Sequence, residues 1–152
     1  MTMTDNAHTA LTDSLNRLLA DYFGLYLKTK SFHWHVTGPR FHDLHLLFDT
    51  QAAELFALTD VIAERVRKNG GMTLTSIGAI AAHSRIADQD SAVLGAEAMI
   101  AELAADNRSL IAALREAKAA ACNAGDNATE GAADDWTDQA EQRIWFLTAL
   151  LG

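Results

Sequence analysis

The chain has 152 residues, 49% of them hydrophobic, which is enough for one domain with a substantial core and too few for two ordinary domains. Its 20 acidic and 12 basic residues give a net charge of −8, which disfavours general binding to nucleic acid phosphates and favours the attraction of cations. No apolar run of about 18 residues and no export signal occur, so we expect a cytoplasmic protein without a membrane anchor. The single cysteine, Cys122, excludes an intrachain disulfide.

Alanine and leucine dominate the sequence and proline occurs once, which is typical of long helices and argues against a sheet. A first helix is predicted to begin between Thr9 and Thr12, after a flexible tail over residues 1–8, and to end before Pro39. A second helix is predicted to follow this proline and to end at the glycines at 70–71, which suit a left-handed helix end.

The second half of the chain contains a connection and two further helices. Residues 72–89 read as a mixed segment with one short helix over 77–82. A third long helix is predicted over about 91–123 and a fourth over about 129–150, with the loop 125–127 between them. Four long helices with one extended connection between the second and the third predict a single all-α domain, an antiparallel four-helix bundle with a crossover.

The second predicted helix has two different faces. At about 100° per residue, four side chains of the kind that bind metals share one of them: His45, Asp49, Asp60 and Glu64. The apolar stripe that must pack into the bundle lies on another: Leu44, Leu47, Phe48, Leu55, Leu58, Ile62 and Val66. The metal-binding types therefore point away from their own core. Beside them Leu46 and Phe56 would be exposed to water in a lone chain, which predicts a subunit interface.

The four polar side chains form two i,i+4 pairs, and each pair is half of a metal site. The pairs lie about 22 Å apart along the helix axis, so a single helix cannot bring both to one ion. A two-fold axis near residues 54 and 55 would set the helix antiparallel to its mate. It would bring His45 and Asp49 level with Glu64 and Asp60 of the partner chain. The dimer would hold two equivalent sites, whose imidazole and carboxylate ligands suit iron, zinc or manganese.

The run from Lys28 to Glu64 resembles the Dps family of miniferritins, and the four-helix plan is similar to that family over nearly the whole chain. The His-Trp of the first helix, the Leu-His-x-x-Phe-Asp of the second and the Asp-x-x-Ala-Glu beyond it keep the family's spacing. The resemblance implies a ferritin-like fold and ferroxidase sites between two-fold-related subunits. The implied site residues are His33, His45 and Asp49 from one chain and Asp60 and Glu64 from the other, with Trp34 close by.

The resemblance also implies an activity and an assembly. Family members form hollow dodecamers that oxidise ferrous iron, preferably with hydrogen peroxide, and store ferric mineral inside. We therefore expect Fe2+ and hydrogen peroxide as substrates, iron as the bound metal, and a role in protection against oxidative damage. Many family members also bind DNA through basic terminal tails. The alternative function is thus a DNA-compacting structural protein with a vestigial or structural metal site, although the first sixteen residues contain no Lys or Arg.

Simpler interpretations exist for several of these residues. His33 taken alone is typical of a core histidine, and Asp60 with Glu64 taken alone is typical of a charged helix surface. Trp34 is by default an apolar interface anchor, with electron transfer as the other interpretation. Their spacing and the shared register favour the metal site. Four acidic residues around the start of the fourth helix line either an ion-entry pore or a solvated face: Asp126, Glu130, Asp134 and Asp135.

Other catalytic motifs are missing from the sequence. No glutamate is followed three residues later by a histidine, so the di-iron site that ferritins hold inside one bundle is not expected. The sequence also has no Cys-x-x-Cys pair, no glycine-rich phosphate loop and no nucleophile elbow.

Overall fold

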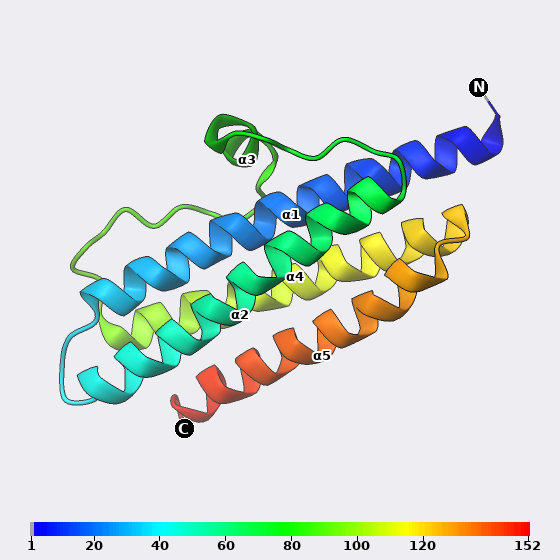
Figure 1. The fold of residues 1–152 in the computed structure, drawn as a ribbon. Coiled ribbons are helices and arrows are strands. Elements are labelled where there is room, and N and C mark those ends of the chain that lie inside the picture. The colour runs from blue at the N-terminus through cyan, green and yellow to red at the C-terminus, as the bar shows by residue number, and fades with distance from the viewer. Residues whose placement is uncertain (1) are drawn as a thin grey trace.

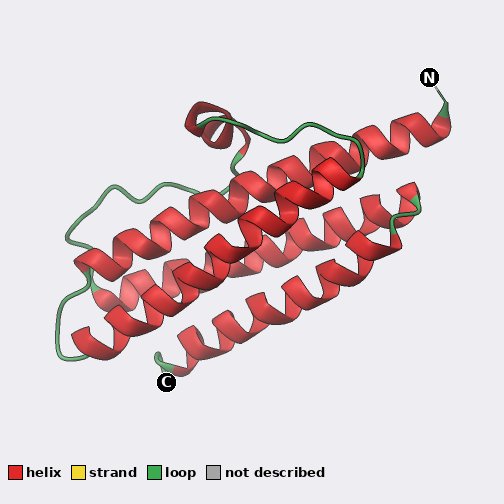
Figure 2. Ribbon diagram, in the orientation of Figure 1, coloured by secondary structure: helices red, strands yellow, loops and turns green. Residues whose placement is uncertain are grey.

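The computed structural model describes residues 2–152, which form five α-helices and, within that range, no strand (Figures 1 and 2). The helices are α1 (Met3–His35), α2 (Phe41–Lys68), α3 (Ile77–His83), α4 (Ala96–Ala124) and α5 (Asn127–Ala149). The four long helices lie side by side, while the short α3 packs on the outer side of α1 (Figure 1). The connection between α2 and α4 runs the length of the bundle. The predicted four-helix bundle with a crossover is confirmed.

The first helix begins earlier than its predicted start. It starts at Met3, because Thr2 and Asp5 form a reciprocal capping box. The Thr2 hydroxyl accepts a hydrogen bond from the Asp5 N–H at 3.1 Å, and the Asp5 carboxylate accepts one from the Thr2 N–H at 2.9 Å. The tail predicted over residues 1–8 is therefore helical from Met3 onwards, and Met1 lies outside the described residues.

The other helix ends follow local signals. Gly70 adopts a left-handed conformation with φ 82° after α2, as predicted, and Gly125 ends α4 with φ 72°. The short helix α3 extends one residue beyond its predicted end. The helix α4 begins at Ala96, later than predicted, and its N-cap residue Gly95 is extended and supplies no side-chain cap. Asp126 then caps α5, accepting a hydrogen bond from the Thr129 N–H at 3.1 Å.

The core of the bundle is built from one apolar stripe on each long helix. The predicted stripe of α2 is buried at Leu44, Phe48, Leu55, Leu58, Ile62 and Val66 and partly buried at Leu47. Because this stripe packs inward, the opposite side of α2 is left open. No helix within residues 2–152 is both long enough and apolar enough to cross a membrane.

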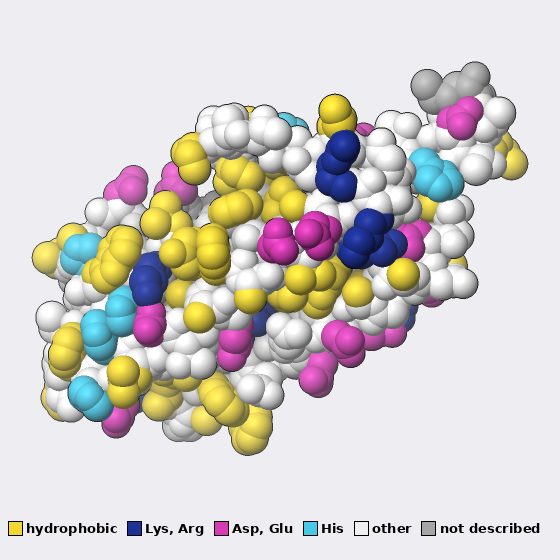
Figure 3. Space-filling view, viewed as in Figure 1, with side chains coloured by type: hydrophobic (Ala, Val, Ile, Leu, Met, Phe, Trp, Pro, Cys, Tyr) yellow, Lys and Arg dark blue, Asp and Glu magenta, His cyan; other side chains and the backbone are white. Residues whose placement is uncertain are grey.

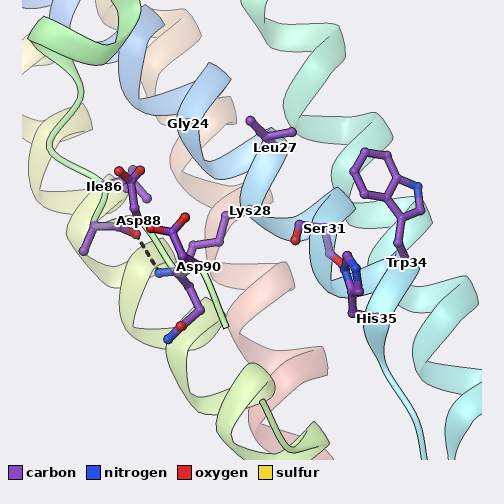
Figure 4. Close-up of a pocket in the computed structure, with 11 residues that line it drawn as sticks. Gly24, Leu27, Lys28, Ser31, Trp34, His35, Ile86, Asp88 and Asp90 are labelled. Carbon is purple, nitrogen blue, oxygen red and sulfur yellow. Dashed lines mark hydrogen bonds between the residues drawn. The ribbon is translucent and has the colours of Figure 1, made fainter. Parts of the chain in front are cut away.

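Two charged side chains of α1 hold the crossover against the bundle. The buried Asp21 carboxylate accepts hydrogen bonds from the Arg85 backbone N–H at 2.6 Å and from its guanidinium at 2.7 and 2.9 Å. Burial raises the pKa of Asp21, and the hydrogen bonds from Arg85 offset only part of this effect. Lys28 donates to the Ala87 carbonyl at 3.0 Å (Figure 4) and pairs with Asp106 on α4 at 2.8 Å. These contacts fix the crossover across α1.

A polar cluster lies inside the bundle between the four long helices. Arg143 on α5 is 1% exposed, and its Nε donates to the Asn107 Oδ1 at 2.8 Å. Its Nη1 lies 3.6 Å from the Glu54 carboxylate, and its carbonyl accepts from the Gln51 side chain at 3.3 Å. Both Nη atoms and the hydroxyl of the buried Tyr22 find no hydrogen-bond partner among residues 2–152. A guanidinium therefore occupies the interior of this bundle.

Candidate metal centre

The end of α1 and the start of α2 bring two of the predicted ligands together. The rings of His33 and His45 stack with centroids 3.8 Å apart and planes 15° apart. Phe41 stacks against the His45 ring, with centroids 5.1 Å apart. The turn between the helices includes Gly38 with φ 108°, a conformation that favours glycine. The antiparallel approach of the two helices thus places both imidazoles at one corner.

The two imidazoles are oriented by crossed hydrogen bonds. The His33 Nδ1 lies 2.6 Å from the His45 carbonyl oxygen, and the His45 Nδ1 lies 2.7 Å from the His33 carbonyl oxygen. A carbonyl oxygen only accepts, so each Nδ1 must carry the proton and donate it. In the neutral ring, Nε2 then keeps its lone pair. This is how metal-ligating histidines are commonly oriented by their outer-shell partners.

Asp49 lies one turn beyond His45 and completes this part of the site. Its Oδ1 is 3.8 Å from the His33 Nε2, and it forms an ion pair with Lys30 on α1. The hydrogen bond from Lys30 lowers the pKa of Asp49. The sequence pattern alone does not single out Lys30, although it precedes His33 by three residues and so shares its helix face. We call His33, His45 and Asp49 the histidine half.

Asp60 and Glu64 form a separate carboxylate half on the same outward face of α2. Both side chains are exposed, and they lie about 22 Å along the helix from the histidine half by helix rise. No group of three His, Cys, Asp or Glu side chains within residues 2–152 could hold a metal ion by itself. One chain therefore carries the two halves on one face and does not bring them together.

Large apolar side chains surround the two halves. Leu46 is 51% exposed, Phe56 52% and Trp34 57%. Figure 3 shows hydrophobic side chains spread over α1, α2 and α3, with histidine and acidic groups among them. The predicted exposure of Leu46 and Phe56 is confirmed. Their burial against a partner chain remains a prediction.

Trp34 lines a cavity of about 290 Å3 between the end of α1 and the crossover. Figure 4 shows its ring turned away from Asp88 and Asp90, which lie on the opposite side of the cavity. Lys28 lies between the two sides with its ammonium directed at the crossover. Trp34 is thus an exposed indole at the end of α1, next to His33 in the sequence. Its role in electron transfer or in an interface stays a prediction.

The acidic segment around the start of α5 is partly engaged in contacts within the chain. Burial would raise the pKa of Asp126, but hydrogen bonds from Thr129, Arg65 and Asn69 outweigh it and hold this pKa well below its usual range. The Asp126 carboxylate lies 2.7 Å from the Arg65 guanidinium and thereby joins the end of α2 to the start of α5. Further along the same segment, Asp134 pairs with Lys118 on α4 at 2.6 Å. These contacts favour a structural role for Asp126.

Comparison with known proteins identifies the family. The protein-family model for the ferritin-like domain matches residues 12–152 of this chain. A DNA protection during starvation protein of Brevibacillus brevis is 33% identical over 90% of this chain and 91% of its own length. The crystal structure of Dps from Thermosynechococcus elongatus superposes with a TM-score of 0.95 at 28% identity, covering 99% of this chain and 96% of that one. That of a Dps protein from Bacillus brevis superposes with a TM-score of 0.93 at 30% identity, covering 97% and 98%. The chain belongs to the Dps family of ferritin-like proteins.

Proposed function

We propose that this protein oxidises Fe2+ at sites shared by two chains and stores the product as ferric mineral in a hollow oligomer. Each site would take His33, His45 and Asp49 from one chain and Asp60 and Glu64 from its two-fold partner. The proposal includes a cytoplasmic dodecamer, hydrogen peroxide as the oxidant and protection against oxidative damage. Iron is the substrate and the cargo of this reaction.

The observation that carries the proposal is the crossed pair of hydrogen bonds between the two histidines. Both Nδ1 protons are held by carbonyl oxygens at 2.6 and 2.7 Å, so both Nε2 lone pairs are free for a metal ion. The membership of the ferritin-like family supports iron as the metal. The separation of the two halves on α2 supports the sharing of ligands between chains.

Binding of iron would require Asp49 to exchange one partner for another. In the single chain the carboxylate is paired with Lys30. Both side chains are partly exposed, so water can solvate the released ammonium group and the exchange costs little. Carboxylates from Asp49, Asp60 and Glu64 favour the harder Fe3+ over Fe2+, which promotes oxidation at this site.

The electron balance explains why two ferrous ions per peroxide would be protective. Two Fe2+ supply two electrons, and hydrogen peroxide takes these with two protons to become two water molecules. The O–O bond breaks without release of a hydroxyl radical. Trp34 lies beside the histidine half and could supply an electron when only one Fe2+ is bound.

Mixing two inactive variants tests whether the site is shared. One variant carries His45→Ala with Asp49→Ala, and the other carries Asp60→Ala with Glu64→Ala. Each alone should oxidise Fe2+ at least about tenfold more slowly than the wild type, because every site lacks half of its ligands. In a mixed dimer, one site has both halves and the other has neither. Random pairing should therefore restore roughly a quarter of the wild-type sites on co-expression.

The measurement is the initial rate of peroxide-driven Fe2+ oxidation by assemblies of native size and helicity. A matched control co-expresses two copies of the first variant, and this combination should restore no activity. Mixed assemblies that form properly and stay as inactive as the separate variants would show that the ligands are not shared across this two-fold axis.

A further inference from the structure

A polar pocket lies between α2 and α5, away from the candidate metal centre. Its volume is about 200 Å3. Five polar residues contribute to its walls: Thr50, Gln51, Glu54, Gln142 and Arg143. Thr50 and Gln142 are exposed, whereas Arg143 is buried. The pocket therefore leads from the surface of the bundle towards the interior polar cluster.

The guanidinium of Arg143 has more hydrogen-bond donors than partners. An arginine side chain is always charged and carries five N–H groups. The Nε donates to the Asn107 Oδ1 at 2.8 Å, and the four N–H groups of the two buried Nη atoms make no hydrogen bond with residues 2–152. Buried donors are almost always paired, with protein or with ordered water. The site therefore calls for a further acceptor.

Glu54 is an acceptor close to this guanidinium, but it is too far away for a direct hydrogen bond. Its carboxylate oxygen lies 3.6 Å from the Arg143 Nη1, whereas N–H···O hydrogen bonds extend to about 3.2 Å. The Glu54 side chain is 35% exposed at the pocket, so its charge partly faces solvent. A polar contact longer than about 3.5 Å beside a polar pocket is typical of two groups bridged by water.

The amide side chains around Arg143 are already engaged. The Gln51 Nε2 donates to the Arg143 carbonyl oxygen at 3.3 Å. The Asn107 amide nitrogen donates to the Leu103 carbonyl oxygen at 2.8 Å, while its oxygen accepts from the Arg143 Nε. These amides therefore hold the arginine in place and leave Glu54 as the group that a bridging molecule would join to it.

The charges favour a neutral molecule over an anion at this position. Arg143 and Glu54 carry one charge of each sign, so a bound anion would leave the site negative in a chain whose net charge is already −8. The guest has to accept a hydrogen bond from an Nη atom and donate one to a carboxylate. Water does both, and the pocket is far larger than one water molecule requires.

We propose that an ordered water molecule binds between the Arg143 Nη1 and the Glu54 carboxylate at the inner end of the pocket between α2 and α5. Its oxygen accepts a hydrogen bond from Nη1, and one of its hydrogens is donated to Glu54. The buried charge on α5 is then linked to α2 through this water. The inference concerns the bundle interior and does not depend on iron chemistry.

High-resolution diffraction from metal-free crystals tests the site directly. We expect a water peak at about 2.7–3.2 Å from both the Arg143 Nη1 and a Glu54 oxygen. Crystals grown with bromide in place of chloride should give no anomalous bromine peak at this position. A bromine peak would overturn the proposal in favour of an anion site. Direct contact between the Glu54 carboxylate and Nη1, with no water between them, would overturn it as well.

Substitutions at the rim of the pocket test the role of Glu54 without disturbing the buried arginine. Glu54→Leu removes the acceptor and should lower the occupancy of the water by at least about half. Glu54→Gln retains a carbonyl oxygen and should keep the water. Thr50→Val is the matched control, because Thr50 lines the same pocket outside the proposed bridge and its loss should leave the water in place. Full occupancy in Glu54→Leu, or equal losses in Glu54→Leu and Thr50→Val, would show that Glu54 does not hold this water.

Discussion

Two groups of polar side chains on and beside α2 face in different directions and differ in how their charges are satisfied. Towards the bundle interior, Arg143 is almost fully buried and shares its guanidinium with Asn107 and Glu54 of the same chain. On the outward face, Asp49 is about half exposed and forms an ion pair with Lys30. Bulk water cannot reach a buried charge, so the chain has to supply its partners, and among residues 2–152 the Arg143 side chain has one hydrogen bond, from its Nε to Asn107, and one ion pair, with Glu54. An outward charge can keep a temporary partner and exchange it.

The interior cluster also bears on where this fold can hold metal. Ferritin-like di-iron proteins place glutamates and Glu-x-x-His ligands inside the bundle. In this chain the interior position holds a positively charged side chain between α1, α2, α4 and α5. A metal centre on the outward face of α2 is thus compatible with a core whose polar groups serve to stabilise the fold. Substitutions in the two regions should accordingly affect different properties.

The largest expected difference in stability is for Arg143. Replacement by alanine leaves a cavity and an unpaired Asn107, and we expect a loss of about 3–5 kcal/mol in the free energy of unfolding. Arg143→Met, which keeps most of the volume, should lose clearly less. Asp49→Ala should leave the unfolding midpoint of the metal-free protein nearly unchanged and remove iron oxidation.

Urea unfolding at one fixed protein concentration measures these three variants, because dissociation and unfolding are coupled in an oligomer. An Arg143→Ala protein with the midpoint of the wild type would contradict the distinction between the two regions. So would a metal-free Asp49→Ala protein that unfolds as readily as Arg143→Ala.

Asp126 provides an intermediate case at the end of the bundle. Its side chain is 9% exposed, caps α5 and pairs with Arg65. Asp126→Ala should cost about 3 kcal/mol, the sum of a lost helix cap and a lost charged hydrogen bond. Because its folded pKa lies below the ordinary value of 3.8, its stabilising effect is present above that pH and is lost as the pH falls further.

The measurement for Asp126 is the unfolding free energy as a function of pH. The wild type should lose stability on acidification below about pH 4, and Asp126→Asn should show a shallower loss there. Glu130→Gln in the same segment is the control, which should keep the acid dependence of the wild type. Identical acid profiles for the wild type and Asp126→Asn would mean that the contact with Arg65 is not maintained in solution.

Periodicity accounts for what could be predicted from the sequence. A repeat of 3.6 residues separates the two faces of α2 without any tertiary information, and glycines mark the ends of α2 and α4. The partners of Arg143 were not predictable in this way, because Asn107 lies 36 residues away and meets it only through the packing of α4 on α5. The crossed hydrogen bonds of His33 and His45 likewise depend on how closely α1 and α2 approach. Backbone acceptors leave no pattern in a sequence.

Tyr22 should give the smallest effect, although it is buried in the same interior region as Arg143. Its hydroxyl is a polar group without a hydrogen-bond partner among the described residues, so Tyr22→Phe removes an unsatisfied group and should change stability at neutral pH by less than about 1 kcal/mol. Burial raises the pKa of Tyr22 to about 12, and Arg143 offsets only part of this through its positive charge and its approach to the hydroxyl, which falls short of a hydrogen bond in geometry. A folded pKa above the unfolded value of about 10 means that the contribution of the neutral phenol is complete below pH 10 and is lost as the pH rises towards 12. Tyr22→Phe should therefore unfold at a higher pH than the wild type in an alkaline titration followed by phenolate absorbance and circular dichroism.

Tyr26→Phe, whose ring is partly buried, is the matched control. A large loss of stability in Tyr22→Phe at neutral pH would show that the hydroxyl does have a partner, and the interior cluster would then be more completely satisfied than its geometry indicates.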